Sequence, residues 1–184
     1  MFYEQTLSRE NIFNGKVFDI HRDRVKLSDN SEAWREVVEH SGGVCIAAID
    51  ESRNIILVEQ FRYPLNGLTL EVVAGKLDKG EDPDTAASRE LSEETGFSAK
   101  KLIKVGTFYS SPGFCSEKLH FYLATGLTEG EKHPDEGELL NSVILPLGEA
   151  IEKVLADEIT DGKTKALILL ADRILSQQKL HDEE

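Results

Sequence analysis

The fold of this 184-residue chain is decided by one stretch, residues 75–97, which reads GKLDKGEDPDTAASRELSEETGF. Asp82 can accept hydrogen bonds from the first free amides of a helix, and Pro83 suits the first helical position. Gly96 fits the left-handed residue that often follows the end of a helix. These local signals predict a helix from about Pro83 to Thr95.

The predicted helix carries three glutamates on one side. At about 100° per residue, Glu90 and Glu94 lie on one face and Glu93 lies beside them. Neighbouring carboxylates repel one another, but a divalent cation converts this repulsion into oxygen coordination. Arg89, four residues before Glu93, can pair with a carboxylate and hold it in place for a metal. The alternative is a solvated acidic face, which is the usual role of glutamates on a helix.

The whole stretch resembles the Nudix box. From Gly75 the spacing is glycine, five residues, glutamate, seven residues and then RELSEETGF, which matches every defining position of the box. The resemblance implies an α+β Nudix fold, in which a mixed β-sheet is sandwiched between helices and the box forms a metal-binding loop and helix. It also implies that Glu90, Glu93 and Glu94 are metal ligands. The implied cofactor is Mg²⁺, with Mn²⁺ as the alternative.

Segments outside the box are similar to the ADP-ribose pyrophosphatase branch of this family. These segments are Trp34–His40, Gln60–Pro64, Glu71–Asp78 and Ser111–Gly113. The similarity covers roughly residues 13–170. Hydrolases of GDP-mannose and other nucleotide sugars share several of these motifs, so the motifs are less specific than the box.

The resemblance to this branch implies further site residues. Ala74 is expected to offer its backbone carbonyl to the metal, and Glu71 is a candidate for the outer coordination sphere. The expected substrate contacts come from Arg35, Glu36, Arg62, Ser111, Pro112, Gly113 and Glu117. By the same analogy, Arg35 and Glu36 reach the substrate across a dimer interface. For each arginine the alternative is an ordinary surface salt bridge, although an arginine fork suits a diphosphate.

The general base has several candidates. Hydrolysis requires a water molecule to lose a proton while a metal screens the charge of the diphosphate. In the resembling branch, a glutamate on the loop before the last strand orients that water. Here the polar segment 128–138 is expected to be this loop, and Glu138 is the first choice and Glu136 the second. Glu94 completes the expected catalytic residues.

Hydrophobic periodicity predicts the remaining architecture. Residues 1–40 alternate apolar and polar positions and predict two or three strands, which we expect to form a dimerisation region. Residues 41–184 are expected to form the Nudix domain. Within it we predict strands at about 44–49, 55–61, 68–73, 102–109, 119–125 and 139–145, and closing helices at about 148–158 and 163–178.

The composition is that of an ordinary globular protein, with 40% hydrophobic and 30% charged residues. The net charge of −13 disfavours nucleic acid and anionic membranes as partners. No apolar run approaches the roughly 20 residues of a transmembrane helix, and the first residues lack a signal-peptide pattern. Cys45 and Cys115 have no metal-binding or redox spacing, so we expect free thiols and a cytoplasmic location.

The sequence therefore predicts a Mg²⁺-dependent pyrophosphohydrolase that converts ADP-ribose and water to AMP and ribose 5-phosphate. One alternative is another small nucleoside-diphosphate substrate, such as GDP-mannose, ADP-glucose or a dinucleotide. A second is a Nudix sensor that binds ADP-ribose without cleaving it. The sensor predicts missing box carboxylates or an attached DNA-binding domain, whereas this chain keeps every box carboxylate. A nucleotide-pool enzyme for oxidised triphosphates is disfavoured by the longer N-terminal region and Pro112.

Overall fold

The computed structural model describes residues 2–133 and 139–182, and the chain divides into two units. The first unit comprises Met1–Gly42 and Tyr109–Leu119, and the second comprises Gly43–Phe108 and His120–Glu184. Each unit is described separately below.

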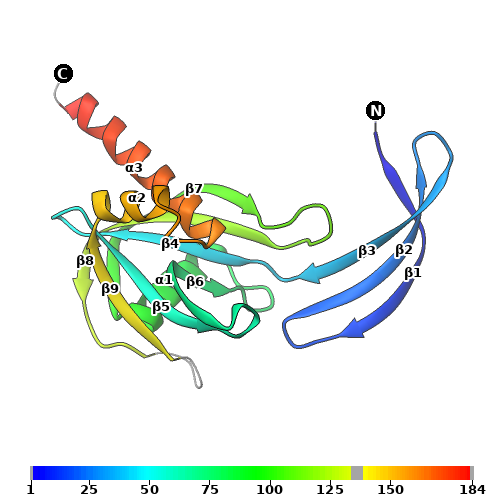
Figure 1. Cartoon of the computed structure of the whole chain (residues 1–184), viewed down its shortest axis with the longest axis horizontal. Helices are drawn as coiled ribbons and strands as arrows, with labels where there is room; N and C mark the ends of the chain where they lie inside the picture. The colour runs from blue at the N-terminus through cyan, green and yellow to red at the C-terminus, as the bar shows by residue number, and fades with distance from the viewer. Residues whose placement is uncertain (1, 134–138, 183–184) are drawn as a thin grey trace. The chain divides into compact units, whose positions relative to one another are not determined.

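The first unit is built on an antiparallel sheet of β1 (Glu4–Asn14), β2 (Phe18–Leu27) and β3 (Glu32–His40), in that order (Figure 1). Every residue of β1 is exposed. Residues 109–119 attach to β3 through backbone hydrogen bonds. The Val38 amide donates to the Phe114 carbonyl at 2.8 Å, and the Ser116 amide donates to the Val38 carbonyl at 2.9 Å. Two distant parts of the sequence therefore meet in this unit.

The second unit contains a six-stranded mixed sheet in the described part of the chain, with the order β7-β8-β4-β6-β5-β9. Its strands are β4 (Gly43–Ile49), β5 (Asn54–Arg62), β6 (Gly67–Lys76), β7 (Phe97–Tyr109), β8 (Lys118–Glu129) and β9 (Leu140–Pro146). At one end β4 and β5 pair directly, as in Ala48 with Ile56. Further along they separate, and β6 pairs with both of them. The insertion of β6 brings the start of the box to the centre of the sheet.

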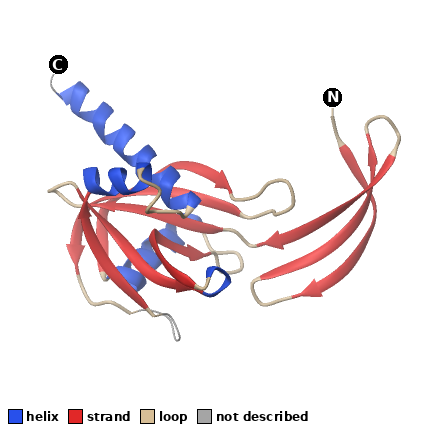
Figure 2. Cartoon of the chain, in the orientation of Figure 1, coloured by secondary structure: helices blue, strands red, loops and turns tan. Residues whose placement is uncertain are grey.

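Helices cover both faces of this sheet, with α2 and α3 on one side and α1 on the other (Figure 2). These helices are α1 (Pro83–Thr95), α2 (Leu147–Leu155) and α3 (Gly162–Asp182). Under α1, the side chains of Val44, Ile46, Val58, Val73 and Leu91 share one buried cluster. On the other side, Leu167, Ile168 and Ala171 of α3 are fully buried. The predicted α+β class, with a mixed sheet between helices, is confirmed.

Helix α1 begins and ends as its local signals predict. The Asp82 carboxylate accepts hydrogen bonds from the amides of Asp84 and Thr85 at 3.0 and 3.3 Å, and Pro83 follows it. At the other end Gly96 has φ 79° and its amide donates to the Ser92 carbonyl at 2.8 Å. These caps satisfy backbone groups that a helix end leaves unpaired.

Replacing Asp82 with alanine is expected to lower the free energy of unfolding by about 1 kcal/mol, because two amides of α1 lose their acceptor. Urea unfolding followed by circular dichroism measures this change. Asp82→Asn is the matched control, since asparagine caps helices about as well as aspartate. Equal losses in both variants would show that the carboxylate charge matters rather than the cap.

Most strands are longer than their apolar runs predict. Strand β7 begins at Phe97 rather than near residue 102, and β8 extends to Glu129 rather than ending near residue 125. The length of a strand is set by its hydrogen-bonded neighbours as well as by its own residues. The sequence also did not predict the short 3₁₀ helix at Tyr63–Leu65. None of the described helices combines the length and the apolar character needed to cross a bilayer.

Candidate active site

The three glutamates of α1 lie against the end of β6. Glu94 and Glu90 are buried, at 3% and 9% exposure, while the Glu93 side chain is 29% exposed. A carboxylate oxygen of Glu94 accepts a hydrogen bond from the Ala74 amide at 3.3 Å. Buried carboxylates are costly unless cations or donors compensate them. A solvated acidic face is therefore excluded for Glu90 and Glu94.

Arg89 binds the acidic side chains around it. Its Nε and Nη2 atoms donate to both carboxylate oxygens of Glu81 at 2.9 and 3.0 Å. Its Nη1 atom donates to Glu90 and to Glu93, each at 2.8 Å. The hydrogen bonds that Arg89 donates to Glu81 raise the pKa of Arg89 above its ordinary value. The predicted pairing of Arg89 with Glu93 is thus observed, and one arginine orders three carboxylates.

Gly75 is required by the position of Glu90. A Cβ atom at residue 75 would lie 1.8 Å from the carboxyl carbon of Glu90 and 2.0 and 2.2 Å from its oxygens. The Glu90 carboxylate therefore occupies the space that any other side chain would fill. The sequence identified this glycine only as the first residue of the box, and its close contact with Glu90 could not be read from the spacing.

The chemistry of these groups fits a divalent cation. Carboxylates and a backbone carbonyl are the oxygen ligands that Mg²⁺ prefers, and two of the carboxylates here are buried. Among the described residues, no three acidic, histidine or cysteine side chains already form a metal site. Arg89 contacts both Glu90 and Glu93, so metal binding would require these carboxylates to rearrange around Arg89. The donors that would hold a cation are Glu90, Glu93, Glu94 and the Ala74 carbonyl.

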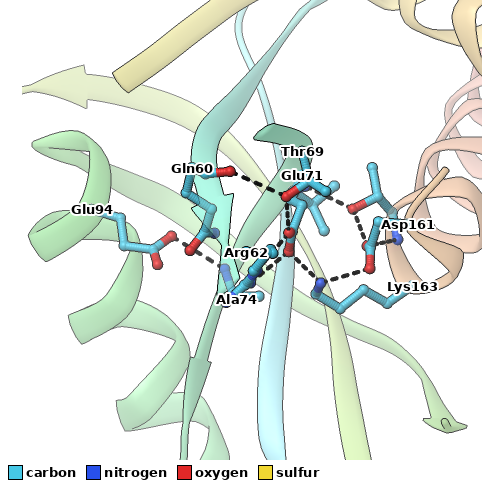
Figure 3. A network of polar contacts seen from close by, with 10 residues as sticks. Gln60, Arg62, Thr69, Glu71, Ala74, Glu94, Asp161 and Lys163 are labelled. Atoms are coloured by element: carbon cyan, nitrogen blue, oxygen red, sulfur yellow. Dashed lines mark hydrogen bonds and ion pairs between the residues drawn. The ribbon is translucent and has the colours of Figure 1, made fainter. Parts of the chain in front are cut away.

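A second polar network surrounds Glu71 on β6 (Figure 3). Arg62 donates from Nε and Nη2 to the two carboxylate oxygens of Glu71, each at 2.7 Å. The Thr69 hydroxyl donates to one of these oxygens at 2.6 Å, and Lys163 of α3 pairs with the other. Glu71 is only 1% exposed. The predicted substrate residue Arg62 thus has a buried partner rather than a surface salt bridge.

The start of α3 is fixed to this network. Lys163 also pairs with Asp161 at 3.0 Å. The second oxygen of Asp161 accepts hydrogen bonds from the amide and hydroxyl of Thr164 at 2.9 and 2.6 Å. The Thr164 hydroxyl oxygen in turn accepts the Val72 amide at 3.0 Å. None of Asp161, Lys163 and Thr164 was predicted as a site residue, because only the tertiary fold brings them to β6.

Glu71 is expected to make stability depend on pH in the acidic range. Burial alone would raise the pKa of Glu71, but the hydrogen bonds from Arg62 and the charge of Lys163 outweigh it and lower the pKa from 4.5 to about 2. A carboxyl group with a lowered pKa stabilises the fold above its unfolded pKa. This contribution, on the order of 3 kcal/mol, is lost as the pH falls from about 4.5 toward 2.

The measurement is urea unfolding of the wild type and Glu71→Gln at neutral pH and at about pH 3. The wild type is expected to be clearly more stable at neutral pH, and most of the difference disappears at the lower pH. A difference that stays constant between the two conditions would contradict the lowered pKa of Glu71.

The predicted substrate residues outside β5 lie in the first unit. Arg35 of β3 forms a bidentate pair with Glu4 at 2.6 and 2.9 Å. This is the surface salt bridge that the sequence offered as the alternative to a substrate contact. Glu36 is exposed and lies opposite Arg22 in the ladder with β2. Both of these residues sit on the strand to which residues 109–119 attach.

The segment after β7 carries the other predicted contacts. The Ser111 carbonyl accepts the amides of Phe114 and Cys115 at 3.1 and 2.9 Å, which closes a turn through Pro112 and Gly113. A carboxylate oxygen of Glu117 lies 3.8 Å from Nδ1 of His40. The structure therefore gathers the predicted residues into two groups, one in each unit. Glu136 and Glu138 lie outside the described residues, so their assignment stays a prediction.

Comparison with known proteins identifies the family. The Nudix domain model matches residues 39–170. The chain is 43% identical to an ADP-ribose pyrophosphatase of Bacillus subtilis (strain 168) over 163 residues, or 88% of each chain. It is 40% identical to a methanol dehydrogenase activator of Bacillus methanolicus over 89% of this chain and 90% of the relative.

A solved structure supports the fold. A crystal structure described as an ADP compounds hydrolase superposes with a TM-score of 0.83 over 95% of both chains, at 24% identity. Hydrolases that share this domain generally use divalent metal ions, in agreement with the oxygen donors around Gly75. Together with the box on the loop and helix α1, these matches show that the chain belongs to the Nudix family.

Proposed function

We propose that this protein is a Mg²⁺-dependent pyrophosphohydrolase that cleaves ADP-ribose to AMP and ribose 5-phosphate. The observation that carries the proposal is the pair of buried glutamates on α1, Glu90 and Glu94, with Glu94 hydrogen-bonded to the Ala74 amide at the end of β6. The similarity to an ADP-ribose pyrophosphatase over most of both chains supports the choice of substrate. Water adds to one phosphorus, the bridging P–O bond breaks, and the two phosphate monoesters leave.

Three groups of residues are proposed to bind the cation, bind the diphosphate and accept the proton. Glu90, Glu93, Glu94 and the Ala74 carbonyl would hold the cation, which neutralises the charge that develops on the diphosphate. The guanidinium of Arg62 binds a phosphate oxygen through the nitrogen that Glu71 does not occupy. The proton of the attacking water passes to a glutamate of the segment that precedes β9 in the sequence, with Glu138 proposed first and Glu136 second.

The first unit is proposed to recognise the remainder of the substrate and to form a homodimer. The recognition residues are Arg35, Glu36, Ser111, Pro112, Gly113 and Glu117. Large apolar side chains are exposed on this unit and support the dimer: Phe2, Tyr3, Ile12, Phe13, Phe18 and Trp34. Sedimentation equilibrium measures the oligomeric state, and a monomer at micromolar concentration would contradict this part of the proposal.

We also propose that the reaction takes place in the cytoplasm. Neither Cys45 nor Cys115 forms a disulfide in the part of the chain that the structure describes. Free thiols are typical of proteins in reducing compartments.

The test is turnover on a panel of ADP-ribose, GDP-mannose, ADP-glucose and a nucleoside triphosphate with Mg²⁺, with products separated by chromatography. The proposal expects the highest kcat/KM with ADP-ribose, and AMP as a product. If GDP-mannose or ADP-glucose has the highest kcat/KM, the substrate assignment is wrong and the hydrolytic mechanism remains. Tight binding of ADP-ribose without any turnover of the panel would favour the sensor.

A further inference from the structure

Among the described residues, one side of the Arg62 guanidinium has no hydrogen-bond partner. Its Nε and Nη2 atoms bind Glu71, while Nη1 donates to no residue in the part of the chain that the structure describes. The side chain is 39% exposed, although its partner carboxylate is buried. The hydrogen bonds to Glu71 raise the pKa of Arg62, and the charges of Asp161 and Glu94 add to this effect. Arg62 is therefore a cation held in a fixed position, and it interacts electrostatically with Glu94 of α1.

Glu71 has no freedom to turn away from Arg62. One of its oxygens accepts from Arg62 and Thr69, and the other accepts from Arg62 and Lys163. Four donated hydrogen bonds saturate the lone pairs that a carboxylate can offer. A bidentate pair of this kind fixes the plane of the guanidinium as well as its position.

Lys163 connects this pair to α3. Its ammonium group bridges Glu71 and Asp161, and Asp161 is itself held by Thr164 at the first turn of the helix. Figure 3 shows Lys163 between Glu71 and Asp161 on the α3 side, while Glu94 extends from α1 toward Ala74. The two cations and the two carboxylates of this group balance in charge.

We propose that Glu71 is a positioning residue that aims the free side of Arg62 at the substrate diphosphate, and that Lys163 holds Glu71 in that orientation. The proposal rests on the function proposed above, since it assigns the diphosphate to Arg62. It gives Glu71 a role through Arg62 rather than through the outer coordination sphere of the metal. It also makes the start of α3 part of the substrate-binding apparatus.

A double-mutant cycle between Glu71→Gln and Arg62→Met tests the coupling. Glu71→Gln is expected to raise KM for ADP-ribose by about tenfold, with kcat changed by less than about threefold, because an aimed arginine contributes to ground-state binding. In the Arg62→Met background the same change is expected to leave KM within about twofold. Equal increases of KM in both backgrounds, or a loss confined to kcat, would overturn the proposal.

Two further variants guard against a simple folding defect. Glu71→Gln combined with Lys163→Met keeps the charge balance of the network, and it is expected to raise KM as the single change does. Lys165→Met is the matched control, since Lys165 lies two residues along α3 and pairs with exposed Asp157. It is expected to leave KM unchanged. A KM at the wild-type value in the balanced double variant would also overturn the proposal.

A readout without substrate separates this proposal from the substrate assignment. Solvent exchange of the Arg62 Nε–H, measured by ¹⁵N NMR, is expected to be slow in the wild type and clearly faster in Lys163→Met, but not in Lys165→Met. Unchanged exchange in Lys163→Met would overturn the role of Lys163. If the wild type cleaves another diphosphate of the panel instead of ADP-ribose, the KM cycle is measured on that substrate.

Discussion

Replacing Glu94 with glutamine is expected to lower kcat for diphosphate hydrolysis by about 10³-fold, which corresponds to about 4 kcal/mol in the barrier. Glu94 is 3% exposed and accepts the Ala74 amide at 3.3 Å. Glutamine has nearly the same shape and can still accept that hydrogen bond. The change therefore removes the charge that a divalent cation needs while it leaves the packing of α1 on β6 in place.

The measurement is kcat at saturating ADP-ribose over a titration of Mg²⁺, together with the melting temperature. Glu158→Gln is the matched control, because the Glu158 side chain is 60% exposed, lies outside the segment that carries the candidate bases and undergoes the same chemical change. It is expected to retain wild-type kcat. A Glu94→Gln protein that keeps more than about a tenth of wild-type kcat would contradict a metal-ligand role.

Replacing Gly75 with alanine is expected to lower kcat by at least about 100-fold with little loss of stability. The new methyl group would lie 1.8 Å from the carboxyl carbon of Glu90, a distance that no pair of unbonded carbon atoms tolerates. Because the contact is with the end of a flexible side chain, Glu90 can move aside and the fold survives. The displaced carboxylate would then be lost to the cation.

Gly106→Ala is the control for Gly75→Ala, since a Cβ atom there meets no other atom within 4 Å. Thermal unfolding and kcat are measured for both variants. Parallel losses of stability and activity in Gly75→Ala would point to a general packing defect instead of a displaced ligand. Recovery of activity at high Mg²⁺ concentration would agree with weakened metal binding.

Local signals determined how well each element of the fold could be predicted. Helix α1 was predicted at the bounds that the structure shows, because Asp82, Pro83 and Gly96 specify its ends within a few residues. Strand β7 was predicted about five residues short. After Phe97 its first residues are polar or small, as in Ser98 and Lys100, and they join the strand through pairing with β8, which the sequence alone could not identify as the neighbour.

The same distinction applies to the candidate site. The grouping of the α1 glutamates on one side of the helix and the pairing of Arg89 with Glu93 followed from helical spacing, whereas the metal-ligand role of the glutamates came from the resemblance to the box. The partner of Arg62 did not, although Glu71 is only nine residues away, because the two strands had to be placed in register first. Lys163 lies 92 residues from Glu71, and nothing in its own segment indicates that contact.

The hydroxyl of Thr164, which receives the Val72 amide across 92 residues of sequence, also sets the order in which this unit can assemble during synthesis. When β4, β5 and β6 have emerged from the ribosome, the Val72 amide still lacks its native acceptor, the hydroxyl of Thr164. The buried Glu71 also lacks Lys163, one of its two cationic partners, until the first turn of α3 has been synthesised. We therefore expect the central sheet to close cooperatively only after residue 164 has left the exit tunnel.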